Sequence, residues 1–174
     1  MQEKPTNQPQ VKLTENDWIR LKEFYAFQKE EEKILGEFRL AAQSHIDEVI
    51  EELYNWFFKF DDVKKFFPDA DTVKRVKRYQ KEHFLTLTGG VYDLEYVRQR
   101  LKVGQTHRRI GLPPNLYIGA YSFYMQSMVP RLIRSFEYNR AMQTRAISAF
   151  IKLIALDQAL VLGTYFEETE IRKD

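Results

Sequence analysis

The chain has 174 residues, 44% of them hydrophobic, which is enough for the core of one domain and excludes a chain that is disordered throughout. Its 27 Lys and Arg nearly balance 25 Asp and Glu, for a formal charge of +2, which argues against a nucleic-acid partner or an anionic membrane surface. The chain has no Cys, which excludes disulfides, a cysteine nucleophile and thiolate metal sites.

The first twelve residues are polar and contain no apolar segment that could act as a secretory signal. We therefore expect a disordered tail over residues 1–12 and one domain over residues 13–174 of a cytoplasmic protein. The most apolar stretch, residues 146–163, is interrupted by Lys152, Asp157 and Gln158, so no membrane span is predicted.

The first half of the domain shows helical spacing of its apolar residues. Thr14 is an expected N-cap of a helix over residues 15–30. A second helix is expected over 31–42, and Ser44 is expected to cap a third over 45–59. The segment 61–71 predicts a short helical turn that ends at Pro68.

The second half is expected to hold four longer helices, whose starts and ends are marked by capping residues, glycines and prolines. They run from 71 or 72 to Gly89, from Asp93 to Gly111, over 114–136 and over 139–170. Pro130 should kink the helix over 114–136. No alternating strand pattern interrupts this series, so the sequence predicts an all-α protein, compatible with a globin and with other helical folds.

The three histidines, His45, His83 and His107, are far apart in the sequence. None belongs to a Glu-x-x-His or His-Glu-x-x-His pattern, so the residues predict neither a di-iron bundle nor a zinc site. His107 differs from the others because Gly104 and Gly111 flank it in the segment LKVGQTHRRIGLPPNLYIGAY.

The surroundings of His107 fit a ligand site. Val103 and Ile110 lie one turn before and after it, and the missing side chains of Gly104 and Gly111 would leave room for a planar ligand. The Val103 carbonyl could accept a hydrogen bond from one ring nitrogen and leave the other for a metal. The residues equally allow a cationic His near a helix C-terminus, with Gly111 as an ordinary C-cap.

Tyrosines are prominent on two of the expected helices. Tyr54 shares a helix face with Phe57, and its hydroxyl needs a partner, which could be a polar ligand or a backbone carbonyl. The helix over 114–136 carries Tyr117 and Tyr121 and is apolar around nearly its whole circumference. Such a helix must be buried on more than one side. It could face a ligand on one side and a partner subunit on the other, or it could be a central helix of the core.

The segment THRRIGLPPNLYIGAY resembles the His-x-Arg-Ile-Gly-Leu-x-Pro-x-x-Tyr-x-Gly-Ala segment of globin-coupled sensors, the heme domains of bacterial aerotaxis transducers, diguanylate cyclases and histidine kinases. The resemblance extends over residues 13–168 and includes LTGGVYDLEYVRQR and LDQALVLGTYF. It implies an all-α globin fold with an extra N-terminal helix and a bound heme b. It also implies a non-enzymatic oxygen sensor that forms a homodimer through its last two helices and signals to an output domain or partner.

The resemblance also assigns residues to the heme pocket. His107 matches the heme-ligating proximal His, Tyr54 the distal Tyr that hydrogen-bonds oxygen, and Tyr117 a Tyr that responds to ligand binding. Tyr79 stands where relatives have a small hydroxyl residue or another distal group, so the distal donor is either Tyr54 or Tyr79. The remaining expected pocket residues are Phe57, Phe66, Phe67, Val76, Val103, Gly104, Ile110 and Tyr121.

Some alternatives stay open at this point. A sixth-position His occurs among such globins, but Tyr79 is better placed than His83 to face iron, and His45 is expected at the surface. CO and NO are further candidate ligands besides O2. One rival function is a globin enzyme acting on nitric oxide or peroxide, which would need a reductase. The other is a heme-free helical interaction domain, against which His107 and its flanking glycines argue.

Overall fold

The structure, a computed structural model, describes residues 13–166. The expected N-terminal tail and the end of the expected last helix lie outside the described residues. The described part contains no strand and seven helices, which are α1 (Glu15–Phe24), α2 (Lys29–Phe57), α3 (Asp61–Lys64), α4 (Ala70–Leu87), α5 (Leu94–Arg109), α6 (Pro114–Ser135) and α7 (Arg140–Phe166). The predicted all-α class is therefore confirmed.

Helix α1 begins with the expected cap. The Thr14 hydroxyl accepts a hydrogen bond from the Asp17 amide (3.2 Å), and the Asp17 carboxylate accepts one from the Thr14 amide (3.0 Å). The helix ends at Phe24, earlier than predicted, because the chain turns at Ala26 with a φ of 50°. Trp18 is buried and donates its ring N–H to the Tyr92 carbonyl (2.9 Å), which fixes α1 on the segment before α5.

The prediction of two helices between residues 31 and 59 is wrong, because α2 is one continuous helix of 29 residues. Ser44 lies inside it and caps nothing. Neither Gly nor Pro occurs between residues 37 and 57, so no residue there breaks the helix. The buried side chains continue at spacings of three and four straight through Ser44, and they are Ile34, Leu35, Phe38, Ala42, Ile46, Val49, Ile50 and Leu53.

The later helices start and end close to the predicted positions. Asp69, two residues before the predicted start, caps α4 by accepting from the Thr72 amide (2.6 Å). Asp93 caps α5 as predicted and accepts from the Tyr96 amide (3.0 Å). After α5 the chain turns at Gly111 with a φ of 70°, a conformation that favours glycine.

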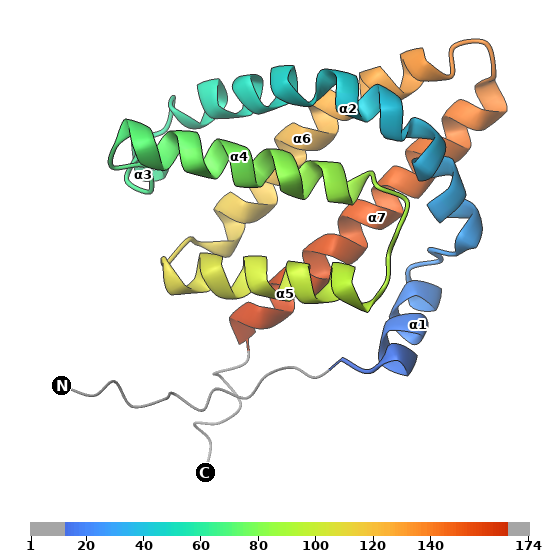
Figure 1. Ribbon diagram of the computed structural model, residues 1–174, viewed down its shortest axis with the longest axis horizontal. Helices are drawn as coiled ribbons and strands as arrows, with labels where there is room; N and C mark the ends of the chain where they lie inside the picture. The colour runs from blue at the N-terminus through green and yellow to red at the C-terminus, as the bar shows by residue number, and fades with distance from the viewer. Residues whose placement is uncertain (1–12, 167–174) are drawn as a thin grey trace.

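The closely packed helix pairs are α5 with α7, α6 with α7, and α2 with α4, α6 and α7. The pair of α4 and α5 is not among them. In Figure 1, α4 and α5 run one above the other, and α6 and α7 cross the same region obliquely. Side chains of α4 and α5 nevertheless meet, because Nδ1 of His83 on α4 lies 3.1 Å from the Arg100 guanidinium on α5.

Helix α7 is the one described helix that is long and apolar enough to cross a membrane by length and composition, and half of its most apolar window is buried. It packs against three other helices, and its buried residues extend from Ala146 to Thr164. The apolar composition of α7 thus matches its position in the core of the helical domain.

Candidate functional site

His107 lies in the last turn of α5, with its ring 5.3 Å from that of Tyr117 on α6. Its Nδ1 is buried and has no hydrogen-bond partner in the described part of the chain. Burial lowers the pKa of His107 to about 4, so the ring is neutral at neutral pH. A neutral imidazole with an unpartnered nitrogen is the form in which histidine binds a metal.

Two expectations about the surroundings of His107 are wrong. The Val103 carbonyl does not orient the ring, because Nδ1 has no partner. Gly104 does not make room for a planar ligand, because it faces α7. A Cβ there would clash with the Thr164 side chain and lie 2.7 Å from the Val161 carbonyl oxygen. Gly104 therefore permits the close approach of α5 and α7.

The tyrosines predicted beside His107 are both buried. The ring of Tyr117 lies between those of His107 and Tyr121, and its centroid is 5.0 Å from that of Tyr121. Val103 packs against the core, whereas Ile110 is 51% exposed. The proximal part of the predicted site is thus assembled from α5 and α6, with Ile110 at its outer edge.

A second part of the predicted site gathers around Tyr54 on α2. Its buried ring lies 5.5 Å from the rings of Phe57 and Phe67, and the Lys77 ammonium lies 5.4 Å from its centroid. Burial raises the pKa of Tyr54, so the hydroxyl keeps its proton. Within the described residues this hydroxyl forms no hydrogen bond, and it is therefore available as a donor to a ligand.

Tyr79, the alternative distal tyrosine, is placed differently. Its side chain is 53% exposed and stacks with the Arg78 guanidinium at 5.3 Å. The structure does not bring it together with Tyr54. Val76, one turn earlier on α4, is half-buried and packs against the core, and Phe66 contacts Lys65. Of the two candidate donors, Tyr54 is the one enclosed by apolar side chains.

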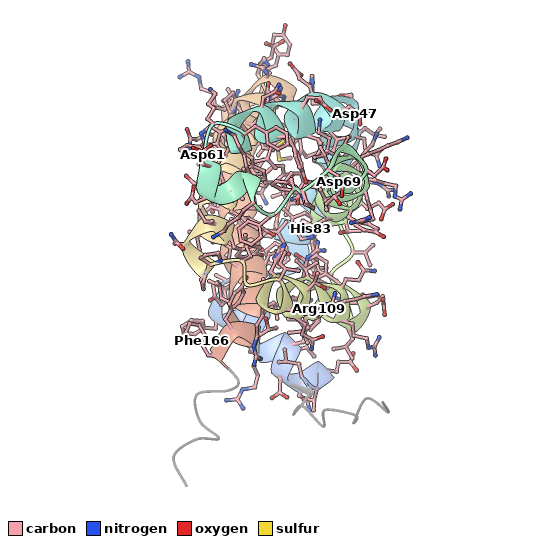
Figure 2. All side chains as sticks on the ribbon, turned by 90° about the vertical axis from the view of Figure 1, so that its left-hand side faces the viewer. Asp47, Asp61, Asp69, His83, Arg109 and Phe166 are labelled. Carbon is pink, nitrogen blue, oxygen red and sulfur yellow. The ribbon has the colours of Figure 1, made fainter. Side chains whose placement is uncertain are left out.

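His83 belongs to a buried polar network that sequence reasoning missed. Its Nε2 lies 2.7 Å from the Tyr121 hydroxyl and its Nδ1 lies 3.1 Å from the Arg100 guanidinium. Asp157 completes the network from α7 and is fully buried. Figure 2 shows His83 between α4, which carries it, and the end of α5 that is marked by Arg109.

Electrostatics hold this network in one charge state. Burial alone would raise the pKa of Asp157, but Arg100 and the hydroxyls of Tyr121 and Tyr96 keep it below its usual range. Burial lowers the pKa of His83 to about 3. At neutral pH the network therefore contains a carboxylate, a guanidinium and a neutral imidazole. The only sequence signal was Asp157, a charged residue inside the apolar stretch 146–163.

Other features of the described chain do not compete with the His107 site. His45 is at the surface as predicted, 3.6 Å from Glu48. The described residues contain no group of three His, Cys, Asp or Glu side chains that could hold a bare metal ion. A groove of about 430 Å³ lies between α2 and α6, lined by Glu52 and by residues of α6 that include Phe123 and Arg131, and no predicted site residue lines it.

The half-buried His107, which belongs to no group of metal-binding side chains among the described residues, suits a metal whose other ligands come from a macrocycle, and it lies in an all-helical fold. These features define a globin-type domain. The Protoglobin family matches residues 14–170, and the chain belongs to this family.

The chain is also similar to a curated relative and, in its fold, to a solved structure. The heme-based aerotactic transducer HemAT of Halobacterium salinarum is 28% identical over 130 residues, which are 70% of this chain and 27% of that protein. The chain thus spans about a quarter of the length of this relative. The globin domain of the Geobacter sulfurreducens globin-coupled sensor aligns with a TM-score of 0.80 at 19% identity, over 84% of this chain and 96% of that domain. The predicted globin fold is confirmed.

Proposed function

We propose that this chain is a heme-based gas sensor domain that binds O2. The observation that carries the proposal is the ring of His107, which is neutral, partly enclosed by aromatic side chains and provided with a buried nitrogen that has no partner. Membership of the Protoglobin family and similarity to a heme-based aerotactic transducer support it. CO and NO are further ligands of the same chemical class.

In this proposal, one part of the site binds the heme and the other part contacts the gas. His107 would hold the iron of a heme b, and heme supplies an iron atom that takes a diatomic gas. Tyr54 offers a protonated hydroxyl as a hydrogen-bond donor to the gas, and Phe57 and Phe67 pack against its ring. Tyr117 contacts the His107 ring, so it would sense a displacement of that ring.

We further propose that the domain is cytoplasmic, that it is not itself an enzyme, and that it signals as a homodimer through α6 and α7 to an output domain or partner. Exposed apolar side chains on both helices support such an interface, and they are Ile118, Ile133, Ile151 and Phe166. Light scattering at micromolar concentration should give about twice the chain mass of 20.9 kDa. A monomeric mass would remove the dimer from the proposal.

The function is tested by titrating heme into the purified protein and recording visible spectra in the ferric, ferrous and gas-exposed forms. We expect one heme per chain, and a ferrous spectrum that changes reversibly with O2 and with CO. A protein that takes up no heme would refute the proposal. Steady consumption of nitric oxide or peroxide in the presence of a reductant would point to an enzyme instead.

Replacing Tyr54 with Phe should speed the release of O2 roughly ten- to a hundredfold, because a hydrogen bond to a partly charged oxygen contributes about 1.5–3 kcal/mol. Stopped-flow displacement of O2 by CO measures this rate. The exposed tyrosine provides the control, since Tyr79→Phe should leave the rate unchanged. If the Tyr79 variant changes the rate and the Tyr54 variant does not, the donor has been assigned to the wrong tyrosine.

A further inference from the structure

Four side chains from four different helices form a closed ring of hydrogen bonds. Arg100 (α5) contacts Nδ1 of His83 (α4) at 3.1 Å, and Nε2 of His83 contacts the Tyr121 hydroxyl (α6) at 2.7 Å. That hydroxyl donates to Oδ2 of Asp157 (α7) at 2.5 Å, and Nε of Arg100 donates to Oδ1 of the same carboxylate. Three of the four side chains are buried, with at most 3% exposed, and His83 is 10% exposed.

The direction of every hydrogen bond in this ring follows from chemistry. A guanidinium can only donate, so Nδ1 of His83 must accept. A neutral imidazole has one proton, which must therefore be on Nε2, and Nε2 donates to the oxygen of Tyr121. The Tyr121 hydroxyl then donates to the Asp157 carboxylate, which can only accept. No other arrangement of protons keeps Arg100 and Asp157 charged.

Neighbouring contacts hold the ring in this arrangement. The Tyr96 hydroxyl donates to Oδ1 of Asp157 (2.5 Å), and the third nitrogen of Arg100 donates to the Thr86 hydroxyl (3.0 Å). All three guanidinium nitrogens of Arg100 thus have a partner. Reversing the His83 tautomer would place two donors against each other at Nδ1, and it would leave Nε2 without its proton.

The ring also lies close to the candidate heme ligand. The Tyr121 ring is 6.2 Å from that of His83 and 5.0 Å from that of Tyr117, which contacts His107. His83 is therefore connected to the His107 site through the rings of Tyr121 and Tyr117. A histidine binds iron through a nitrogen lone pair, which must be free of a proton and of other partners. In the ring, Nε2 has a proton and the lone pair of Nδ1 accepts from Arg100.

We propose that this ring withholds His83 from the heme iron and so keeps the position opposite His107 open for a gas. Arg100 fixes the tautomer by donating to Nδ1, and Tyr121 is the positioning residue, because its hydroxyl accepts from Nε2 and so supplies the second of the two hydrogen bonds that hold the ring in place. This inference rests on the proposed function for its heme. The hydrogen-bond ring itself belongs to the protein alone and can be tested without heme.

The first test is the tautomer of His83 in heme-free protein labelled with nitrogen-15 in its histidines. Long-range proton–nitrogen NMR spectra should show His83 protonated at Nε2 alone, at neutral pH, and the signal is assigned by its loss in His83→Gln. A proton on Nδ1, a mixture of tautomers or a doubly protonated ring would overturn the proposal. This result does not depend on heme uptake, so it separates failure of the ring from failure of the proposed function.

The second test compares spectra of heme-loaded variants. Wild type should show an iron without a second histidine ligand, in the ferric and the ferrous form. Tyr121→Phe should remove one of the two hydrogen bonds that hold the His83 ring, so that the ring can leave Arg100 and convert a measurable fraction to the low-spin spectrum of two histidine ligands. Adding His83→Gln to that variant should abolish the low-spin form. Tyr124→Phe is the matched control, because Tyr124 is also buried on α6 but its hydroxyl has no partner.

The outcomes are distinct. A low-spin spectrum in Tyr121→Phe that disappears with His83→Gln supports the proposal. Two histidine ligands already in wild type overturn it, and so does a Tyr121→Phe spectrum identical to that of wild type. The same low-spin change in Tyr124→Phe also overturns it, because any loss of a buried hydroxyl would then suffice. A wild type that binds no heme refutes the proposed function, and the NMR result still decides whether the ring exists.

Discussion

Replacing His107 with Ala should abolish stable heme uptake and leave the helical fold intact. In the described part of the chain, His107 is the histidine whose buried ring nitrogen has no partner, whereas His83 is fully engaged and His45 is at the surface. Without the imidazole, the iron would have no protein ligand on the proximal side. Soret absorbance per chain after heme titration and gel filtration measures the loss, and far-UV circular dichroism checks the fold.

Two controls make this experiment specific. His45→Ala should retain wild-type heme uptake, because His45 pairs only with Glu48 at the surface. Imidazole added to His107→Gly should restore part of the Soret absorbance by occupying the space left by the side chain. A normal spectrum in the His107→Ala variant would show that another residue binds the iron, and His83 would then be the first candidate.

Replacing Asp157 with Asn should lower the free energy of unfolding by about 3–5 kcal/mol, because it leaves the Arg100 guanidinium buried without a counter-charge. The hydroxyls of Tyr96 and Tyr121 would also lose their charged acceptor. The amide nearly preserves the volume of the carboxyl group, so the effect reports charge and hydrogen bonding, with little contribution from packing. Urea unfolding of the heme-free protein, followed by circular dichroism, measures it.

The matched control for charge is Asp61→Asn, which removes an exposed ion pair with Lys64 and should leave the unfolding curve unchanged. The double replacement of Arg100 with Met and Asp157 with Leu should recover much of the lost stability, because no unpaired charge remains in the core. If Asp157→Asn alone is as stable as wild type, the carboxylate is not charged in the folded protein, and the ring does not contain the proposed ion pair.

Features encoded by nearby residues could be predicted from the sequence. Thr14 and Asp93 were recognised as caps because a capping contact involves residues only three positions apart. His107 and Tyr117 lie ten residues apart in one continuous motif, and the structure brings their rings together. Tyr54 was predicted to lie in an apolar environment because its neighbours on the same helix face are aromatic, and its ring is buried among them.

Features that depend on a distant helix could not be predicted in the same way. From its own helix, the missing side chain of Gly104 predicts room for a ligand. That room is occupied by α7, which is far away in the sequence. Asp157 stood out only as an interruption of an apolar run, and its partner Arg100 lies 57 residues away. The helix break expected at Ser44 was wrong because serine occurs inside helices as well as at N-caps. The continuous stripe of buried side chains, and not the single serine, shows that the helix continues.

The glycine contact between α5 and α7 has a mechanical consequence. Gly104 is one turn before His107, and at this point the α5 backbone lies directly against the Thr164 side chain and the Val161 carbonyl. On the next turn, Arg108 donates to the Thr164 carbonyl (3.2 Å) and fastens the same two segments. The Thr164 hydroxyl donates to the Val161 carbonyl (2.8 Å), so the side chain that faces Gly104 is itself held in place. A movement that begins at the His107 ring must therefore displace the final turns of α7 as one body with its own helix.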